Sequence, residues 1–375
     1  MAPAIFQKLS HDHVPLNKDT PYSEYETIIC GGKVTTTVKT NPEIVNRKEE
    51  SLFRVTVISS SDDSNEFALI ASMSHICGDA HTFYRIYNML LGTTQIVSLK
   101  PQRELLYSQK VMQLMGKQEA HYISHITTDP GWMKLFRLGS DVSNVKEEDA
   151  GSNLHGRVFF INRHWIGNIK ASHMTEGNIS DICTSTLRSP MTPASLKELE
   201  NTTQNNPTQS TNDILVSFFW NLVNPDVGLM TVNFRGRLDG SITQDHAGNY
   251  ANPIPYTRED YKSPTLIRKS LETCRRAGTV AGTNNVPTVL PRANCGLTFS
   301  IVTNWSSFRG GEKTSDDDTM NWRNGLQLIR HLPIIYPNRM IEKMPKRMTF
   351  LVIVLQWAGG YWMYAHCART CDGGD

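Results

Sequence analysis

The sequence has almost no excess of charge of either sign. Its 38 lysine and arginine residues face 36 aspartate and glutamate residues, which leaves a net charge of +2. The basic residues are scattered and form no stripe, and this argues against nucleic acid as a partner. Neither GxxxxGK[ST] nor GxGxxG after a strand occurs, so nucleotide-dependent chemistry has no support either.

Cysteine is sparse and widely spaced. The number is odd, which does not fit a disulfide framework and favours a reducing compartment. The only close pair, Cys367 and Cys371 beside His366, lacks a second ligand pair at zinc spacing. We therefore expect free thiols, no metal and no permanently bound cofactor. The seven cysteines are Cys30, Cys77, Cys183, Cys274, Cys295, Cys367 and Cys371.

Signals for export or membrane insertion are also missing. The start, MAPAIFQKLSHDHVPLNKD, has no basic segment followed by an apolar run. The most apolar stretch, residues 350–365, is short for a membrane span and contains Gln356 and a Gly-Gly pair. Two strands joined at Gly359-Gly360 explain it better. We expect a cytoplasmic monomer without a membrane span.

The length of 375 residues predicts two domains. A segment rich in Ser, Thr, Asn and Pro around residues 174–212 is typical of a crossover between two units. We therefore predict an N-terminal lobe over residues 1–185, a linker over 186–210 and a C-terminal lobe over 211–375.

Strand and helix patterns alternate irregularly along both halves. Residues 52–59 and 67–74 alternate in hydrophobicity and predict a hairpin, and Asp79 is a plausible N-cap for the helix that follows. Thr211, Asn212 and Asp213 form a strong start signal for a helix over residues 214–223. The pattern predicts an α/β chain with mixed sheets. Further strands are predicted over residues 156–161, 229–237 and 297–303.

The segment SHICGD, residues 74–79, is the most informative for chemistry. A histidine in the loop after a strand is held rigidly, and its ordinary pKa lies near neutrality. It can therefore accept a proton from an alcohol or amine that attacks a carbonyl group. Asp79 can fix the loop by pairing with a cation. Asn233, Arg235 and Arg237 would share one face of the strand in TVNFRGRL and could supply that cation.

Four segments in this order resemble the HxxxD-motif superfamily of CoA-dependent acyltransferases. That superfamily includes chloramphenicol acetyltransferase, plant BAHD acyltransferases, fungal trichothecene acetyltransferases and condensation domains of peptide synthetases. The resemblance covers residues 50–92 and 155–310 best. The segments are LFRVTVI…FALIASMSHICGD, TNDILVSFFWNLV, VNFRGRL with GNYAN, and LTFSIVTNWSSF.

The resemblance implies two chloramphenicol-acetyltransferase-like lobes, here with a shortened first lobe, and a channel between them. Acyl-CoA would be the co-substrate, and a small-molecule alcohol or amine the acceptor. His75 would be the general base for direct attack on the thioester. Asp79 would be structural and would pair with Arg235 in preference to Arg237. Thr303 is the first choice for the oxyanion donor, and its neighbours Trp305 and Ser306 are the other candidates.

Departures from the superfamily pattern leave two alternatives open. The glycine that usually follows the aspartate is Ala80 here, so the loop would have to turn differently, at Gly78. Together with the shortened lobe, this motivates an inactive descendant that binds a ligand or partner in the channel. The other alternative is a stand-alone condensation-type domain that uses carrier-protein thioesters. A Cys77 nucleophile, and roles for His81 and His246, are weaker interpretations.

Overall fold

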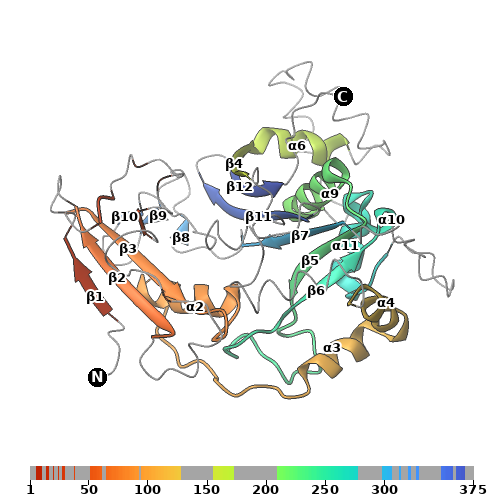
Figure 1. The fold of residues 1–375 in the computed structure, drawn as a ribbon, viewed down its shortest axis with the longest axis horizontal. Coiled ribbons are helices and arrows are strands. Elements are labelled where there is room, and N and C mark those ends of the chain that lie inside the picture. The colour runs from red at the N-terminus through yellow and green to blue at the C-terminus, as the bar shows by residue number, and fades with distance from the viewer. Residues whose placement is uncertain are drawn as a thin grey trace, which may run out of the picture.

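The chain was analysed as a computed structural model. Its described parts build three sheets and the helices around them (Figure 1). The structure describes residues 6–10, 14–16, 20, 24, 28–29, 38, 51–60, 65–92, 94–127, 155–172, 209–277, 298–305, 312–313, 320–321, 327–328, 348–357 and 360–367.

The first sheet has three strands, β1 (Phe6–Leu9), β2 (Phe53–Ser59) and β3 (Phe67–Met73). β1 runs parallel to β2, and β2 pairs antiparallel with β3. The predicted hairpin of residues 52–59 and 67–74 is therefore confirmed. Val55 and Ile58 are buried because alternate residues of a strand face the same side.

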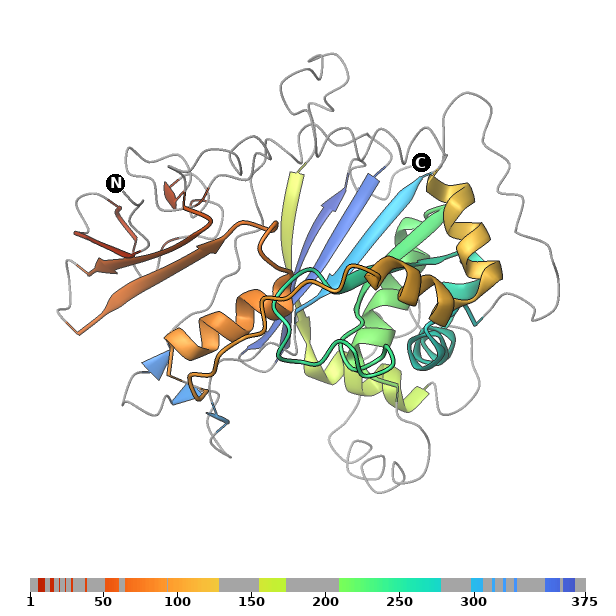
Figure 2. The same cartoon turned by 90° about the horizontal axis from the view of Figure 1, so that it is seen from below.

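Helix α2 (Ala80–Leu90) follows this hairpin directly. Tyr84 and Tyr87 on its apolar face are buried and pack with Leu69 and Ala71 of β3. Figures 1 and 2 both show α2 between the first sheet and the large sheet. The helix thus begins where the two sheets come together.

The large sheet has six strands in the order β4-β12-β11-β7-β5-β6 and mixes both directions. β11 and β7, and β7 and β5, run parallel, whereas the other neighbours are antiparallel. This mixed sheet with its helices confirms the α/β fold class. The two C-terminal strands pair antiparallel, as expected of two strands in the apolar stretch. The strands are β4 (His155–Asn162), β5 (Val227–Asn233), β6 (Ala251–Tyr256), β7 (Phe299–Asn304), β11 (Met348–Trp357) and β12 (Gly360–Cys367).

Helix α9 (Thr211–Val223) forms the centre of the packing on this sheet. Ser210 caps it in a reciprocal capping box with Asp213. The predicted helix is confirmed, but it begins at Thr211, three residues before the predicted start at 214. Trp220 is fully buried, and its indole N–H donates to Ser300 Oγ of β7 at 3.1 Å. A Cβ on Gly228 of β5 would lie 2.8 Å from that indole, so helix and sheet approach closely there.

Shorter helices complete the layer around α9. The buried core that contains Trp220 also takes Val111 and Met115 from α3, and Ile166 and Ile169 from α6. The remaining small sheet has the order β10-β9-β8. These elements are α3 (Tyr107–Met115), α4 (Lys117–Thr127), α6 (Arg163–Ser172), α10 (Arg258–Tyr261), α11 (Pro264–Thr273), β8 (Glu312–Lys313), β9 (Met320–Asn321) and β10 (Gln327–Leu328).

The predicted strand over residues 229–237 ends early. β5 stops at Asn233, and the chain turns over Arg235, Gly236 and Arg237, with Gly236 at φ +73°. Glycine permits this turn because it carries no Cβ. The expectation that Asn233, Arg235 and Arg237 share a strand face is therefore wrong.

Strands from both sides of the predicted linker lie in the large sheet. β4 comes from the segment before it, and the other five strands come from the segment after it. The division into residues 1–185, 186–210 and 211–375 stays a prediction, and most of 186–210 lies outside the described residues. No helix within the described ranges is long and apolar enough to span a membrane.

Candidate functional site

The loop from Ser74 to Asp79 connects β3 to α2, and its start is fixed by backbone hydrogen bonds. The Ser74 N–H donates to Leu52 O at 2.9 Å, which continues the pairing of the hairpin. The Cys77 N–H donates back to Ser74 O at 2.9 Å and closes a tight turn. His75 and Ile76 therefore lie at the tip of this turn, and both are exposed.

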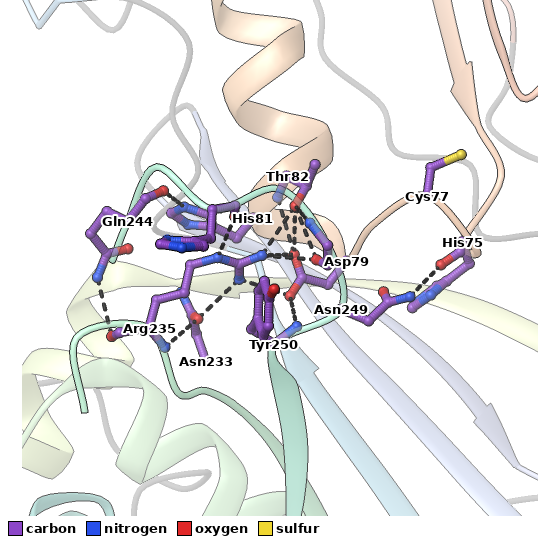
Figure 3. A network of polar contacts seen from close by, with 12 residues as sticks. His75, Cys77, Asp79, His81, Thr82, Asn233, Arg235, Gln244, Asn249 and Tyr250 are labelled. Carbon is purple, nitrogen blue, oxygen red and sulfur yellow. Dashed lines mark hydrogen bonds and ion pairs between the residues drawn. The ribbon is translucent and has the colours of Figure 1, made fainter. Parts of the chain in front are cut away.

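Asp79 ends the loop and caps α2. Its Oδ1 accepts from the Thr82 N–H at 3.1 Å, as expected of an N-cap residue. Arg235 binds both carboxylate oxygens: Nη1 donates to Oδ2 at 2.8 Å, and Nη2 donates to Oδ1 at 3.1 Å. The Tyr250 N–H donates to Oδ2 at 2.9 Å. This is a bidentate, buried ion pair (Figure 3).

The remaining donors of Arg235 are satisfied as well. Nε donates to His246 O at 2.9 Å, Nη2 to Gly248 O at 2.8 Å, and Nη1 to Asn233 Oδ1 at 3.1 Å. Its guanidinium carbon lies 5.0 Å from the centre of the Tyr250 ring. A fully buried guanidinium with this many partners holds one orientation. Arg237 instead donates to Leu271 O at 2.6 Å and does not contact Asp79.

Two opposing effects set the charge of Asp79. Burial alone would raise the pKa of the carboxyl group. The hydrogen bonds and the charge of Arg235, with the amides of Thr82 and Tyr250, outweigh burial and lower the pKa below its ordinary value. Asp79 is therefore ionised at neutral pH and has no proton to donate. It acts as a structural anchor for the loop.

The loop does not turn as the sequence suggests. Gly78 and Ala80 are both absent from the residues with positive φ, so neither needs glycine for its backbone conformation. Ala80 is the first residue of α2, where alanine is favourable. Gly78 is required for space, since a Cβ there would lie 2.6 Å from Thr82 Cβ. The expectation that the chain turns at Gly78 is wrong, and Ala80 causes no distortion.

The His75 side chain extends from this anchored loop. Its carbonyl oxygen accepts from Asn249 Nδ2 at 2.8 Å, whereas no hydrogen bond to its imidazole is found within the described part of the chain. Figure 3 shows His75 and Cys77 on the far side of the loop from Arg235. The imidazole is thus exposed on an anchored backbone.

The end of β7 carries the other predicted site residues. The Trp305 indole N–H donates to Thr303 Oγ1 at 3.1 Å, and the Trp305 ring lies 6.3 Å from the Tyr84 ring of α2. These contacts place the end of β7 beside the helix that follows the His75 loop. The Thr303 hydroxyl accepts from Trp305 and keeps its own proton to donate. Ser306 lies outside the described residues.

The weaker candidates have ordinary structural contacts. Burial raises the pKa of the Cys77 thiol despite the nearby charge of Arg103, which disfavours the thiolate that a nucleophile needs. His81 Nε2 bonds to Gln244 O at 3.0 Å, and His246 Nδ1 accepts from the Thr243 N–H. Burial, with smaller effects from nearby arginines, lowers the pKa of His81.

The sequence did not reveal Thr82, Arg103 or Asn249 as parts of this network. Thr82 stands three residues after the N-cap, and its hydroxyl contacts Asp79, Arg235 and Gly248. Asn249 lies within the GNYAN segment, which predicted only a turn. Arg103 belongs to no motif. Among the described residues no group of three or more His, Cys, Asp or Glu side chains could hold a metal ion. The channel between lobes stays a prediction.

Comparisons with known proteins give structural matches only. No family model and no curated protein matches the sequence. Vinorine synthase matches at 13% identity and a TM-score of 0.40, over 86% of this chain and 63% of that one. The first condensation domain of the CDA synthetase matches at 10% identity and 0.44, over 98% and 69%. TRI101 of F. sporotrichioides, complexed with coenzyme A and T-2, matches at 11% and 0.45, over 96% and 76%.

One of these structures is a condensation domain, and another is a complex with coenzyme A and T-2. The chain spans less than two thirds of the length of vinorine synthase. At such low identities and TM-scores a likeness transfers no activity. The evidence for function therefore lies in the site itself.

Proposed function

We propose that the protein is an acyltransferase that moves an acyl group from acyl-CoA to an alcohol or amine. One observation carries the proposal: the loop that presents His75 is anchored by a buried, bidentate ion pair, while the imidazole is exposed and takes no hydrogen bond from the described residues. A histidine presented on an anchored loop can serve as a general base because its ring nitrogen can take a proton from an attacking hydroxyl or amine. The wide spacing of the cysteines supports a reducing, cytoplasmic compartment.

The reaction needs only one proton carrier. His75 takes the proton from the acceptor hydroxyl or amine as its oxygen or nitrogen attacks the thioester carbonyl carbon. The C=O electron pair moves onto the oxygen and gives a tetrahedral oxyanion. The intermediate collapses, the C–S bond breaks, and the imidazolium returns the proton to the departing CoA thiolate. Every proton and electron pair in this sequence of steps is accounted for without an acyl-enzyme and without a metal.

The oxyanion needs a hydrogen-bond donor. Thr303 is the residue that we propose, because its hydroxyl accepts from the Trp305 indole and so directs its own proton elsewhere. Such donors act most strongly where water is excluded, and the aromatic residues Tyr84, Tyr87 and Trp305 pack together at this end of β7. Asp79 and Arg235 act on the reaction only through the position of the loop.

The test is acceptor-dependent release of CoA thiol from a panel of acyl-CoAs, with the acylated product identified by mass spectrometry. We expect release that requires both an acceptor and His75, and that disappears in a folded His75→Ala variant. Transfer from an acyl-carrier-protein thioester but not from acyl-CoA would support the condensation-type alternative. No transfer from either donor, with a ligand retained by the native protein, would support the inactive binding protein.

A further inference from the structure

Three successive carbonyl groups of the His75 loop accept side-chain hydrogen bonds from outside the loop. His75 O accepts from Asn249 Nδ2 at 2.8 Å. Ile76 O and Cys77 O both accept from Arg103 Nη2, at 3.3 and 2.8 Å. Together with the Asp79 N–H, which donates to Gly248 O at 3.1 Å, these bonds orient nearly every peptide group of the loop. We call Arg103 and Asn249 the carbonyl brace.

The brace is joined to the buried ion pair through one residue, Tyr250. The Tyr250 hydroxyl donates to Gln102 O and accepts from the Glu104 N–H, both at 3.1 Å, so it holds the backbone on both sides of Arg103. The Tyr250 N–H donates to Asp79. Arg103 and Asp79 are therefore fixed to the same turn of the chain, although 24 residues separate them in the sequence, from 79 to 103.

The space for Arg103 is provided by a glycine. Gly248 has φ +143°, and a Cβ on it would lie 2.0 Å from Arg103 Nη1. Any other residue at position 248 would displace the guanidinium from the two carbonyl groups. The Asn249 amide extends from the next residue toward His75 (Figure 3). The turn formed by residues 248–250 thus leaves space for Arg103 and carries Asn249, the two residues of the carbonyl brace.

The orientation of the His75 imidazole depends on this backbone. Catalytic histidines are often oriented by a hydrogen bond to the second ring nitrogen. Within the described part of the chain no such bond to the His75 ring is found, and the side chain is exposed. The direction of the Cα–Cβ bond, which the peptide groups of the loop determine, then sets the point and direction from which the ring extends.

We propose that Arg103 and Asn249 are positioning residues, which fix the backbone of the His75 loop and so direct the imidazole. The inference rests on the proposed function for its effect on turnover, and on the hydrogen bonds alone for its effect on the loop. A permanently charged guanidinium suits this role because charge-assisted bonds to carbonyl groups are stronger than neutral ones. Asn249 supplies the neutral hydrogen bond of the carbonyl brace, to His75 O.

Substitution of each residue gives a loss of turnover with binding retained. We expect Arg103→Ala and Asn249→Ala to lower kcat about 10- to 100-fold, with KM nearly unchanged, since a small misplacement of a catalytic group costs about that factor. Arg103→Lys keeps one cationic donor and should recover part of the loss. Arg85→Ala is the matched control, because this arginine of α2 pairs with Asp245 and has no hydrogen bond to the loop among the described residues.

A double-mutant cycle separates positioning from general damage. If Arg103 acts through His75, its removal from a His75→Ala background should cost no further activity. Additive losses would overturn the proposal. The proposal would also be overturned if Arg103→Ala kept full kcat, or if Arg85→Ala lost as much activity as Arg103→Ala.

Hydrogen exchange tests the brace without any assay of transfer. We expect the backbone amides of residues 75–79 to exchange at least several-fold faster in Arg103→Ala and Asn249→Ala than in wild type and Arg85→Ala. Faster exchange in a protein that transfers no acyl group would contradict the proposed function and leave the brace intact. Unchanged exchange in both brace variants would overturn the brace itself.

Discussion

Asp79 holds the loop because it is charged, buried and fully bonded at once. Removal of one partner from a buried ion pair leaves the other charge uncompensated, which is far more costly than the loss of an exposed pair. The carboxylate also caps α2, so its loss would remove the Thr82 N–H bond as well. Both effects act on the same loop that presents His75.

Substitution of Asp79 should therefore lower stability in a pH-dependent way. We expect Asp79→Asn to lower the free energy of unfolding by about 3 kcal/mol at pH 7. Because the folded-state pKa of Asp79 lies below the unfolded value of about 4, its stabilisation is present above that value and is lost as pH falls through the folded pKa. Urea unfolding between pH 7 and acid measures both effects.

The matched control is Asp245→Asn, which removes an exposed ion pair with Arg85. It should leave stability at pH 7 almost unchanged. The stability of the Asp79→Asn variant should fall less steeply with acid than that of wild type. An equal acid slope in the two proteins would contradict the assignment of a lowered pKa to Asp79.

Thr303 offers a test of the oxyanion site. We expect Thr303→Val to lower kcat about 100- to 1000-fold, because a valine of similar shape has no proton to donate. Trp305→Phe removes only the indole N–H that orients the hydroxyl, so its loss should be smaller. Steady-state kinetics of both variants test this prediction. A larger loss of kcat in Trp305→Phe than in Thr303→Val would assign the oxyanion donor to the indole instead.

Individual residues were predictable to the extent that a local motif signals them. Asp79 as an N-cap, and its pairing with Arg235, follow from short-range patterns and motif order. The predicted geometry was wrong, however, because β5 ends at Asn233 and Arg235 lies in the turn that follows, not on the strand. Arg103 could not be predicted, since its role depends on hydrogen bonds to the carbonyl groups of Ile76 and Cys77 that no periodicity in the sequence indicates.

Helix α2 starts where the loop is most crowded. Gly78 packs against Thr82 of the first turn of the helix, and Ala80 begins the helix with an ordinary backbone. The departure from the superfamily glycine therefore concerns a position that tolerates alanine. The glycine that matters in this loop is Gly78.

Paired substitutions at these two positions test that assignment. Gly78→Ala should destabilise the protein by about 1–3 kcal/mol, because the new methyl group overlaps the Thr82 side chain. Ala80→Gly should cost about 1 kcal/mol, the loss of helix propensity at a half-buried first helical position, and should not raise transfer activity. Chemical denaturation of both variants measures this. A more active Ala80→Gly variant would contradict it.

Strands and helices with strong local patterns were predicted well. The hairpin of β2 and β3, the capped helix α9, and the strands β7, β11 and β12 follow from alternation, capping and turn residues. Boundaries were less predictable where a turn interrupts an apolar run, as at Asn233. Pairing order within the six-stranded sheet could not be read locally, because its neighbours are far apart in the chain.

The two halves of the molecule meet at the residues discussed above. Segments around Asp79 and around Arg235 are linked by the ion pair, by Thr82 with Gly248, and by Asn249 with His75. The sequence order of motifs suggested this meeting, since a histidine loop from one half needs a cation from the other.

The measurement that tests the central claim most directly is the turnover of His75→Ala beside His81→Ala, a nearby histidine with an ordinary backbone contact. Both variants would be assayed for acceptor-dependent CoA release with their folding verified. We expect His75→Ala to lose about 100- to 10,000-fold in kcat and His81→Ala to remain close to wild type. Full activity in a folded His75→Ala variant would contradict the account.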